Sequence, residues 1–573
     1  MVMVPAFNVP QEYWFSLLQA NQALMQQLGA TMIESAVKPQ ARASALVTWA
    51  TDLQVYAQQV STLWTTSVMR LGGAGRTSIA EPEKGDKRFL AQEWRDSPIF
   101  DFLKQYYLLT GRYLNGLIDG SDVSDRARAQ LRFFARQYLD ALSPANFIAT
   151  NPAVLKEALK SHGESLVGGL KNLTEDIQKG RISQTREVAF EVGRNLAVTP
   201  GSVIFENELI QVIQYSPSTD SVRDRPLLMV PPCINKFYLL DMGPENSLVR
   251  YAVEQGNTVF MVSWRNVGSE QGHLTWDDYL ELGVMQAMEV ARQSTGSPKI
   301  NALGFCVGGT LLGCAAAILR ARGDETLASL TLLTTMLDFS DPGEIGLLLD
   351  AAGLAMRQAQ IGRGGVLPGK ELDFVFSTLR GNDLIWPYVV NNYMKGQSPD
   401  AFDLLYWNSD ITNLPGPMYC WYVRNAYLEN AIKVASATVQ CGTPVDLACI
   451  DVPTFLLASR EDHIVPWKTA YASTGLVSGA VRFVLAASGH VAGVINPVSR
   501  NKRNYWTDGE HGHGPDHWLA TAKSVPGSWW QDWSKWLAEH GGDMVPARAT
   551  PGGNRYRLLE PAPGRYVKER ATA

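Results

Sequence analysis

The segment from residue 299 to residue 320 constrains the fold of this chain more than any other part of the sequence. An apolar run, residues 299–303, leads into Gly304-Phe-Cys-Val-Gly308, and a helix-like apolar run follows to residue 320. This order predicts a strand, a tight turn and a helix in direct succession. Cys306 stands at the apex of the turn, where we expect its sulfur to be exposed and able to act as a nucleophile.

A strand, a tight turn and a helix with a nucleophile at the apex form the nucleophile elbow of α/β-hydrolases. Here sulfur replaces the serine oxygen that most of these enzymes carry. A thiol forms a thioester with an acyl group and can hold that group before passing it on. Buried cysteines also occur as small hydrophobic residues, and we interpret Cys314, inside the predicted helix, in that way.

The second part of the chain alternates short apolar runs with helix-like segments such as residues 276–292. This alternation predicts a mostly parallel sheet with helices on both faces, and so an α/β fold of the α/β-hydrolase type. Residues 203–205 and 209–213 resemble a hairpin. The remaining predicted strands lie at residues 227–230, 258–262, 300–303, 330–333, 454–458 and 482–485.

The pattern divides the chain into an N-terminal, mostly helical domain at residues 1–190 and a catalytic domain at residues 191–573. In the first domain, apolar residues recur at three-and-four spacing in residues 14–28, and helix-like stretches run through residues 99–109 and 125–134. In the second domain, about 110 residues, 337–448, separate two predicted strands and are rich in aromatic residues. This insertion is either a lid over the active site or a helical subdomain without a gating role.

Two further candidate catalytic residues follow predicted strands. Asp462 comes just after the run at residues 454–458, and His490 comes after the run at residues 482–485. The order of nucleophile, acid and histidine is that of α/β-hydrolases, and the carboxyl ends of parallel strands meet at one edge of a sheet. We therefore expect His490 to accept the proton of Cys306 and Asp462 to hold the imidazole in the required tautomer.

An acyl-transfer site also needs donors for the oxyanion. The N–H of Val307, which follows the nucleophile, is the expected first donor, and the loop after an early strand should supply the second. Here that loop is residues 230–236. Because Pro231 and Pro232 have no N–H, Ile234 is the candidate for the second donor.

Composition excludes several classes of function. The 573 residues carry a net charge of −5, which does not favour a nucleic-acid partner. Six cysteines without a Cys-x-x-Cys pair indicate reduced thiols in a cytosolic protein. We expect no signal peptide and no transmembrane segment. The three histidines of residues 511–517 lack further ligands at known spacing, so we expect no metal site.

The chain resembles the polyhydroxyalkanoate synthases, since Gly-Phe-Cys306-Val-Gly-Gly is similar to the cysteine box of that family. The likeness covers about residues 85–540, and the cysteine box together with the single-subunit length resembles the class I branch. Phe305 and Pro387 depart from the family, which commonly has Tyr and Asn there. Further similar segments are residues 88–94, 231–238, 382–393, 403–408, 412–418, 427–430 and 460–467.

The resemblance implies polymerisation of short-chain (R)-3-hydroxyacyl-CoA esters, such as 3-hydroxybutyryl-CoA, into polyester with release of CoA. It implies that Cys306 takes the acyl group, that His490 activates the nucleophile, and that Asp462 either orients His490 or activates the incoming hydroxyl. It implies no cofactor, a homodimer, granule-associated protein partners, and a cytoplasmic location at the surface of polyester granules. The alternatives are a cysteine hydrolase of thioesters or lactones and a coat protein of hydrophobic inclusions.

Overall fold

The computed structural model describes residues 39–548 and 550–571, and the chain forms two compact units. One unit comprises residues 187–375 and 402–573 and contains the large sheet. The other comprises the chain up to Arg186 together with residues 376–401 and is helical. The apolar pattern at residues 14–28 lies outside the described residues.

The large sheet has eleven strands, in the order β15-β14-β13-β12-β7-β6-β4-β5-β2-β1-β17. The six from β13 to β5 pair in parallel, and antiparallel strands flank them on both sides. This confirms the predicted α/β fold. The strands are β1 (Gly201–Glu206), β2 (Ile210–Tyr215), β4 (Leu227–Val230), β5 (Val259–Trp264), β6 (Ile300–Phe305), β7 (Leu327–Leu333), β12 (Thr454–Ser459), β13 (Val481–Ala486), β14 (Asn504–Thr507), β15 (Lys523–Pro526) and β17 (Glu560–Pro561).

The central strands are mostly apolar and largely buried because both faces of the sheet are covered. In β4, Leu227 and Met229 belong to one hydrophobic cluster, whereas Leu228 and Val230 belong to another. Side chains alternate across a strand, so each face of β4 contributes to a different core. This explains why the sequence shows continuous apolar runs in place of alternating polar residues.

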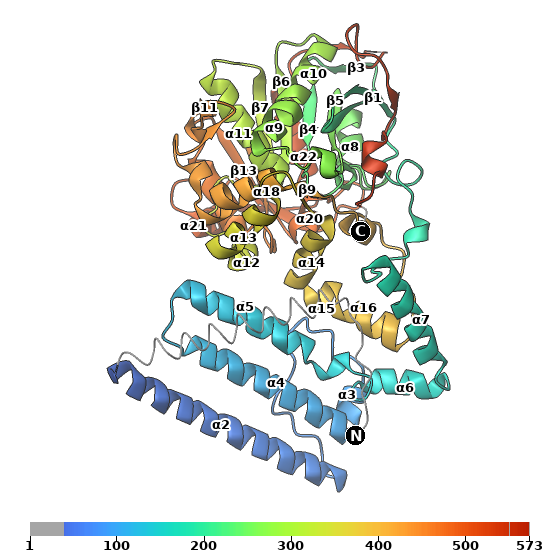
Figure 1. Ribbon diagram of the computed structural model, residues 1–573, viewed down its shortest axis with the longest axis vertical. Coiled ribbons are helices and arrows are strands. Elements are labelled where there is room, and N and C mark those ends of the chain that lie inside the picture. The colour runs from blue at the N-terminus through green and yellow to red at the C-terminus, as the bar shows by residue number, and fades with distance from the viewer. Residues whose placement is uncertain (1–38, 549, 572–573) are drawn as a thin grey trace. The chain divides into compact units, whose positions relative to one another are not determined.

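Helices bury their apolar sides on both of these cores (Figure 1). Two of them, α10 (Gln286–Thr295) and α11 (Val307–Ala321), contribute to the cluster that holds Leu228. Helices α8 (Leu248–Glu254) and α22 (Trp530–Glu539) contribute to the cluster that holds Leu227. The four-tryptophan segment at residues 529–536 therefore packs largely against the core that contains Leu227.

The predicted insertion, residues 337–448, divides between the two compact units. Residues 376–401 belong to the helical unit, and the rest belongs to the unit that contains the sheet. Its helical elements are α12 (Gly343–Leu347), α13 (Ala351–Ile361), α14 (Gly369–Leu379), α15 (Gly381–Leu384), α16 (Trp386–Tyr388), a π-helical turn (Val389–Met394), α17 (Asp403–Asn408), α18 (Gly416–Tyr422) and a second π-helical turn (Val423–Leu428).

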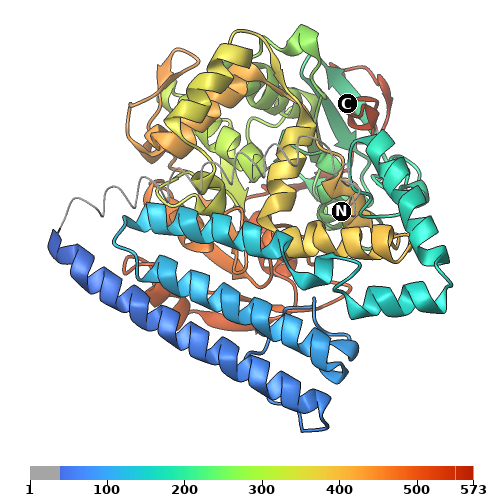
Figure 2. The same ribbon diagram turned by 60° about the horizontal axis from the view of Figure 1, so that its bottom comes forward.

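Within the helical unit, α2, α4 and α5 run side by side in both Figure 1 and Figure 2. Asp101 of α4 is buried and binds Arg70, Arg76 and Lys104. These pairs tie α2 and the following loop to α4. The main helices are α2 (Pro39–Leu71), α4 (Pro98–Asp119), α5 (Asp125–Ala141), α6 (Pro152–Lys160) and α7 (Glu164–Lys179).

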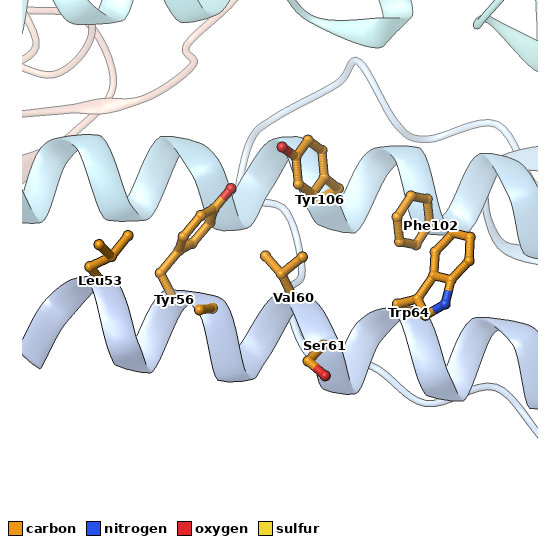
Figure 3. A pocket seen from close by; sticks show the side chains of 8 residues that line it. Leu53, Tyr56, Val60, Ser61, Trp64, Phe102 and Tyr106 are labelled. Atoms are coloured by element: carbon orange, nitrogen blue, oxygen red, sulfur yellow. The ribbon is translucent and has the colours of Figure 1, made fainter.

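Helices α2 and α4 enclose a shallow apolar groove of about 500 Å³. Figure 3 shows side chains of both helices along it, with Trp64 beside Phe102 at a ring separation of 5.7 Å. Its polar atoms come from Ser61, the two tyrosines and the indole of Trp64, and the lining contains no cysteine, histidine or carboxylate. The groove is lined by Leu53, Tyr56, Ala57, Val60, Ser61, Trp64, Phe102 and Tyr106.

Candidate active site

Cys306 occupies the turn between β6 and α11, with φ of 53° and ψ of −127°. A positive φ is strained for any residue with a side chain, and it persists only where the surroundings enforce it. The N–H of Cys306 donates to the carbonyl of Leu333 at 3.0 Å, and its carbonyl accepts from the N–H groups of Gly309 and Thr310. Strand β7 and the first turn of α11 therefore hold the strained residue in place.

The glycines around Cys306 let the helix start directly against the sheet. A Cβ atom added at Gly304 would lie 2.5 Å from the Cα of Gly309. One at Gly308 would lie 2.4 Å from the carbonyl oxygen of Pro231, in the loop after β4. Contacts this close exclude every side chain, so the Gly-x-Cys-x-Gly spacing follows from packing.

Gly308→Ala should destabilise the unit that contains the large sheet by about 2–4 kcal/mol, because the added methyl group must displace backbone atoms. Urea-induced unfolding monitored by tryptophan fluorescence measures this change. The control is Gly116→Ala in α4, where nothing lies within 4 Å of the added Cβ. That substitution should stabilise its helix by up to about 1 kcal/mol. Equal stability of Gly308→Ala and the unsubstituted chain would contradict the packing argument.

Asp462 and His490 lie together beyond the ends of neighbouring parallel strands. Asp462 follows β12, and His490 begins α20 (His490–Val494) after β13. His490 Nδ1 lies 2.7 Å from Asp462 Oδ2. The other carboxylate oxygen of Asp462 accepts the N–H groups of Ile464 at 2.8 Å and Val465 at 2.9 Å. Both carboxylate oxygens are thus engaged, and the carboxylate is fixed in one orientation.

The imidazole of His490 bridges Asp462 and Cys306. Its ring stacks on Phe305 with centroids 5.3 Å apart and lies near enough to Cys306 for the two groups to interact electrostatically. Burial alone would lower the pKa of His490, but the charges of Asp462 and Cys306 and the hydrogen bond to Asp462 raise it to about 10. The imidazole is therefore protonated at neutral pH, held beside the Asp462 carboxylate.

The raised pKa of His490 predicts that the stability of the unit that contains the large sheet depends on pH. An exposed histidine has a pKa of 6.5, so between pH 6.5 and 10 the folded chain binds more protons at this position than the unfolded chain. The stabilisation is complete below pH 6.5 and is lost as the pH rises through 10. Relative to that of His490→Gln, the free energy of unfolding of the unsubstituted chain should fall by a few kcal/mol between pH 6.5 and 10. The expected change is about 1.4 kcal/mol per pKa unit. Urea titrations of both chains at pH 6, 8 and 10 measure the difference, and a constant difference would contradict the assignment.

The two predicted oxyanion donors come from the start of α11 and from the loop after β4. Val307 is the first residue of α11, where an N–H has no partner within the helix. The carbonyl of Ile234 accepts the N–H and the hydroxyl of Thr412, both at 2.8 Å. This fixes the loop after β4, and the role of both N–H groups stays a prediction.

The same loop is bound to the C-terminal segment through a buried lysine. Lys236 Nζ donates to the carbonyls of Glu569 at 2.6 Å and Tyr566 at 3.3 Å. Its own carbonyl accepts the indole N–H of Trp407 at 2.8 Å. Burial lowers the pKa of Lys236 to about 8, while Asp410 and Glu569 act to raise it. Chain segments far apart in sequence thus hold the loop beside Cys306.

The residue-by-residue reasoning missed two tyrosines beside Cys306. The rings of Tyr422 and Tyr427 lie edge to face with centroids 5.5 Å apart, and both phenols interact electrostatically with the Cys306 sulfur. Burial, and then this proximity to negative charge, raises the pKa of both phenols, so they stay protonated as donors. Both come from the end of the long insertion. The family-like segment at residues 427–430 includes Tyr427, whereas Tyr422 lies outside the family-like segments.

Other chemistries find less support in the structure. Within residues 39–548 and 550–571, no three His, Cys, Asp or Glu side chains are grouped as metal ligands would be. His517 of the histidine-rich segment instead lies 3.0 Å from Glu510. All six cysteines are free thiols. Among the described helices, none combines the length and apolar character needed to span a bilayer.

Comparison with known proteins identifies the family. The profile described as "Poly-beta-hydroxybutyrate polymerase (PhaC) N-terminus" matches residues 85–252, and the profile "alpha/beta hydrolase fold" matches residues 226–497. The Poly(3-hydroxyalkanoate) polymerase subunit PhaC of Cupriavidus necator is 52% identical over 90% of this chain and 88% of its own length. The protein of the same name from Rhizobium meliloti is 41% identical over 89% and 84%, and Poly(3-hydroxyalkanoate) polymerase 1 of Ectopseudomonas oleovorans is 36% identical over 87% and 88%. With a strained cysteine, a histidine and an aspartate at the carboxyl edge of its sheet, the chain belongs to the poly(3-hydroxyalkanoate) polymerase family.

Proposed function

We propose that this chain polymerises hydroxyacyl-CoA into polyester with release of CoA, and that Cys306 carries the growing acyl chain as a thioester. The observation that carries the proposal is the arrangement of a half-buried Cys306 with the buried side chains of His490 and Asp462 in a chain of this family. It provides a nucleophile, a proton carrier and a group that orients the carrier.

Two transfers complete one round of elongation. The Cys306 thiolate attacks the thioester carbonyl of the substrate, the bond to CoA sulfur breaks, and His490 gives its proton to the departing CoA thiolate. His490 then takes the proton of a substrate 3-hydroxyl group, whose oxygen attacks the Cys306 thioester. The ester bond forms as the bond to the Cys306 sulfur breaks, and the Cys306 thiolate is regenerated. The first transfer exchanges one thioester for another at nearly equal free energy. The second forms the more stable ester and drives growth.

Water must be kept from the acyl-enzyme, since hydrolysis would end the chain. The His490 side chain is 7% exposed and the Asp462 side chain is fully buried. Tyr422 packs against Phe339 and Tyr427, which supports an aromatic enclosure on the sulfur side. We therefore propose that the insertion at residues 337–448 includes the lid, in a catalytic domain at residues 191–573 that follows the helical domain at residues 1–190.

We assign Asp462 to orienting His490, because both its oxygens are engaged and its side chain has no exposed surface. Asp462→Asn should lower turnover on the order of 100-fold or more, since the amide cannot hold the imidazolium in the same way. In single-turnover experiments, CoA release and chain growth should slow together. Unchanged CoA release with impaired growth would show instead that Asp462 activates the incoming hydroxyl. Asp516→Asn, at an exposed carboxylate, is the matched control.

The substrate we propose is a short-chain (R)-3-hydroxyacyl-CoA, in the first instance 3-hydroxybutyryl-CoA. We propose that the enzyme works as a homodimer. We place it at the surface of polyester granules in the cytoplasm, beside granule-associated proteins. Incubation with (R)-3-hydroxybutyryl-CoA should release CoA and produce insoluble polymer. Release of CoA with only free 3-hydroxybutyrate would favour a thioester hydrolase, the second candidate.

A further inference from the structure

A short basic loop follows the catalytic histidine and is not used by the mechanism above. It comprises residues 499–503, Ser-Arg-Asn-Lys-Arg, and all five residues are exposed. Arg500 and Lys502 form no ion pair with any residue in the described ranges 39–548 and 550–571. Arg460, also exposed, lies over the ring of Trp506 at 4.8 Å.

The sheet register places these cations at the edge that holds the candidate triad. Strand β14 begins directly after the basic loop and runs antiparallel to β13, with Ala486 paired to Tyr505. The N–H of Ala487 donates to the carbonyl of Asn504 at 3.1 Å, and the N–H of Arg460 donates to the carbonyl of Ala486 at 2.8 Å. Arg460 lies two residues before Asp462, and Ala487 lies three before His490. The basic loop therefore enters the sheet beside the carboxyl ends of β12 and β13.

The basic loop has a fixed backbone. Asn501 and Arg503 have φ angles of 41° and 68°, in the left-handed region that side chains disfavour. The carbonyl of Lys502 accepts the side-chain amide of Asn496 at 3.1 Å, and the carbonyl of Arg503 accepts the N–H of Gly527 at 2.9 Å. The Arg503 guanidinium also donates to the carbonyl of Ala492 in α20. The loop is thus bound to the helix that begins with His490.

Acidic residues near the loop do not neutralise it. The Ser499 hydroxyl donates to the backbone carbonyl of Glu245 at 3.5 Å, and Glu461 follows Arg460 in sequence. These two exposed acids stand against four cations, so the local charge is positive although the whole chain carries −5. A positive patch in an acidic protein attracts an anionic ligand.

We infer that Arg500 and Lys502, with Arg460, form the subsite for the phosphate groups of the CoA moiety. The inference rests on the proposed function, since it names the part of the substrate that these cations recognise. The phosphates of CoA lie at the far end of the pantetheine arm from its sulfur. Their subsite must therefore stand apart from Cys306 while remaining at the same edge of the sheet.

The test compares substrates with and without phosphates. In the double variant Arg500→Gln/Lys502→Gln, KM for (R)-3-hydroxybutyryl-CoA should rise about tenfold with little change in kcat, since two charge-assisted contacts are lost. For the N-acetylcysteamine thioester of the same acid, which has no phosphate, kcat/KM should stay the same. Lys523→Gln is the control, because Lys523 pairs with Thr507 at the opposite end of β14. Circular dichroism verifies that each variant is folded.

Direct binding separates this inference from the proposed function. Calorimetric titration with adenosine 3′,5′-bisphosphate, which carries phosphates of CoA but no reacting group, should show binding that weakens about tenfold in the double variant. This result would support the subsite even if the chain formed no polymer. Equal affinity of both chains for this probe, or equal losses of kcat/KM with both thioesters, would overturn the inference.

Discussion

Replacing Cys306 with alanine is expected to lower CoA release by at least about 10³-fold and to abolish polymer formation. No other described nucleophile lies at the elbow, and the methyl group of alanine can form no thioester. Release of CoA from (R)-3-hydroxybutyryl-CoA is measured with a thiol reagent, and the missing acyl-enzyme is detected by mass spectrometry.

Cys449→Ala is the matched control, because it removes a half-buried thiol far along the chain from the elbow. It should leave turnover within about twofold, as most substitutions away from a site do. Normal CoA release by Cys306→Ala would refute the nucleophile assignment, and an acyl adduct on another cysteine would identify its replacement.

His490→Ala should have the second largest effect, a loss of turnover of about 10²–10⁴-fold. The variant lacks the cation beside the Cys306 sulfur and the group that carries protons to CoA and from the incoming hydroxyl. Turnover should fall mainly through kcat, because the ring binds the reacting atoms more than the remainder of the substrate. Stopped-flow measurement of CoA release separates the slowed acylation from later steps.

His273→Ala provides the comparison, since His273 is exposed and its ring contacts only the nearby carbonyl of Glu270 in the described structure. That variant should turn over normally. Added imidazole should restore part of the activity of His490→Ala, whereas a variant impaired by misfolding would gain nothing. Full activity of His490→Ala would remove the histidine from the mechanism.

The parallel core of the sheet could be predicted because each central strand is a short, mostly apolar run. Residues 227–230 were predicted as a strand and form β4 with the same bounds. The closeness of Asp462 and His490 followed from one further rule, that parallel strands end at a common edge. In these strands, the local sequence pattern and the packing of the sheet both require mostly apolar residues.

The predicted hairpin is confirmed as the antiparallel pair β1–β2, but the outermost antiparallel strands could not be predicted in this way. Strand β15 is Lys-Ser-Val-Pro and mostly exposed, and β17 is only the two residues Glu560–Pro561. Their pairing is determined by neighbours distant in sequence, which a local pattern does not contain. The same holds for Tyr422 and Tyr427, because only the folded insertion brings them to the sulfur of Cys306.

The attachment of the C-terminal segment has a consequence for how the enzyme is made. Gln211 binds Glu560 across 349 positions of sequence, and Lys236 binds Glu569 across 333. During synthesis on a ribosome, the loop beside the nucleophile has been translated long before its partners exist. Closing such long-range contacts is slow, and until they close Lys236 lacks two of its acceptors. A nascent chain that already contains Cys306, Asp462 and His490 should therefore complete its active site only after residues 560–569 have emerged.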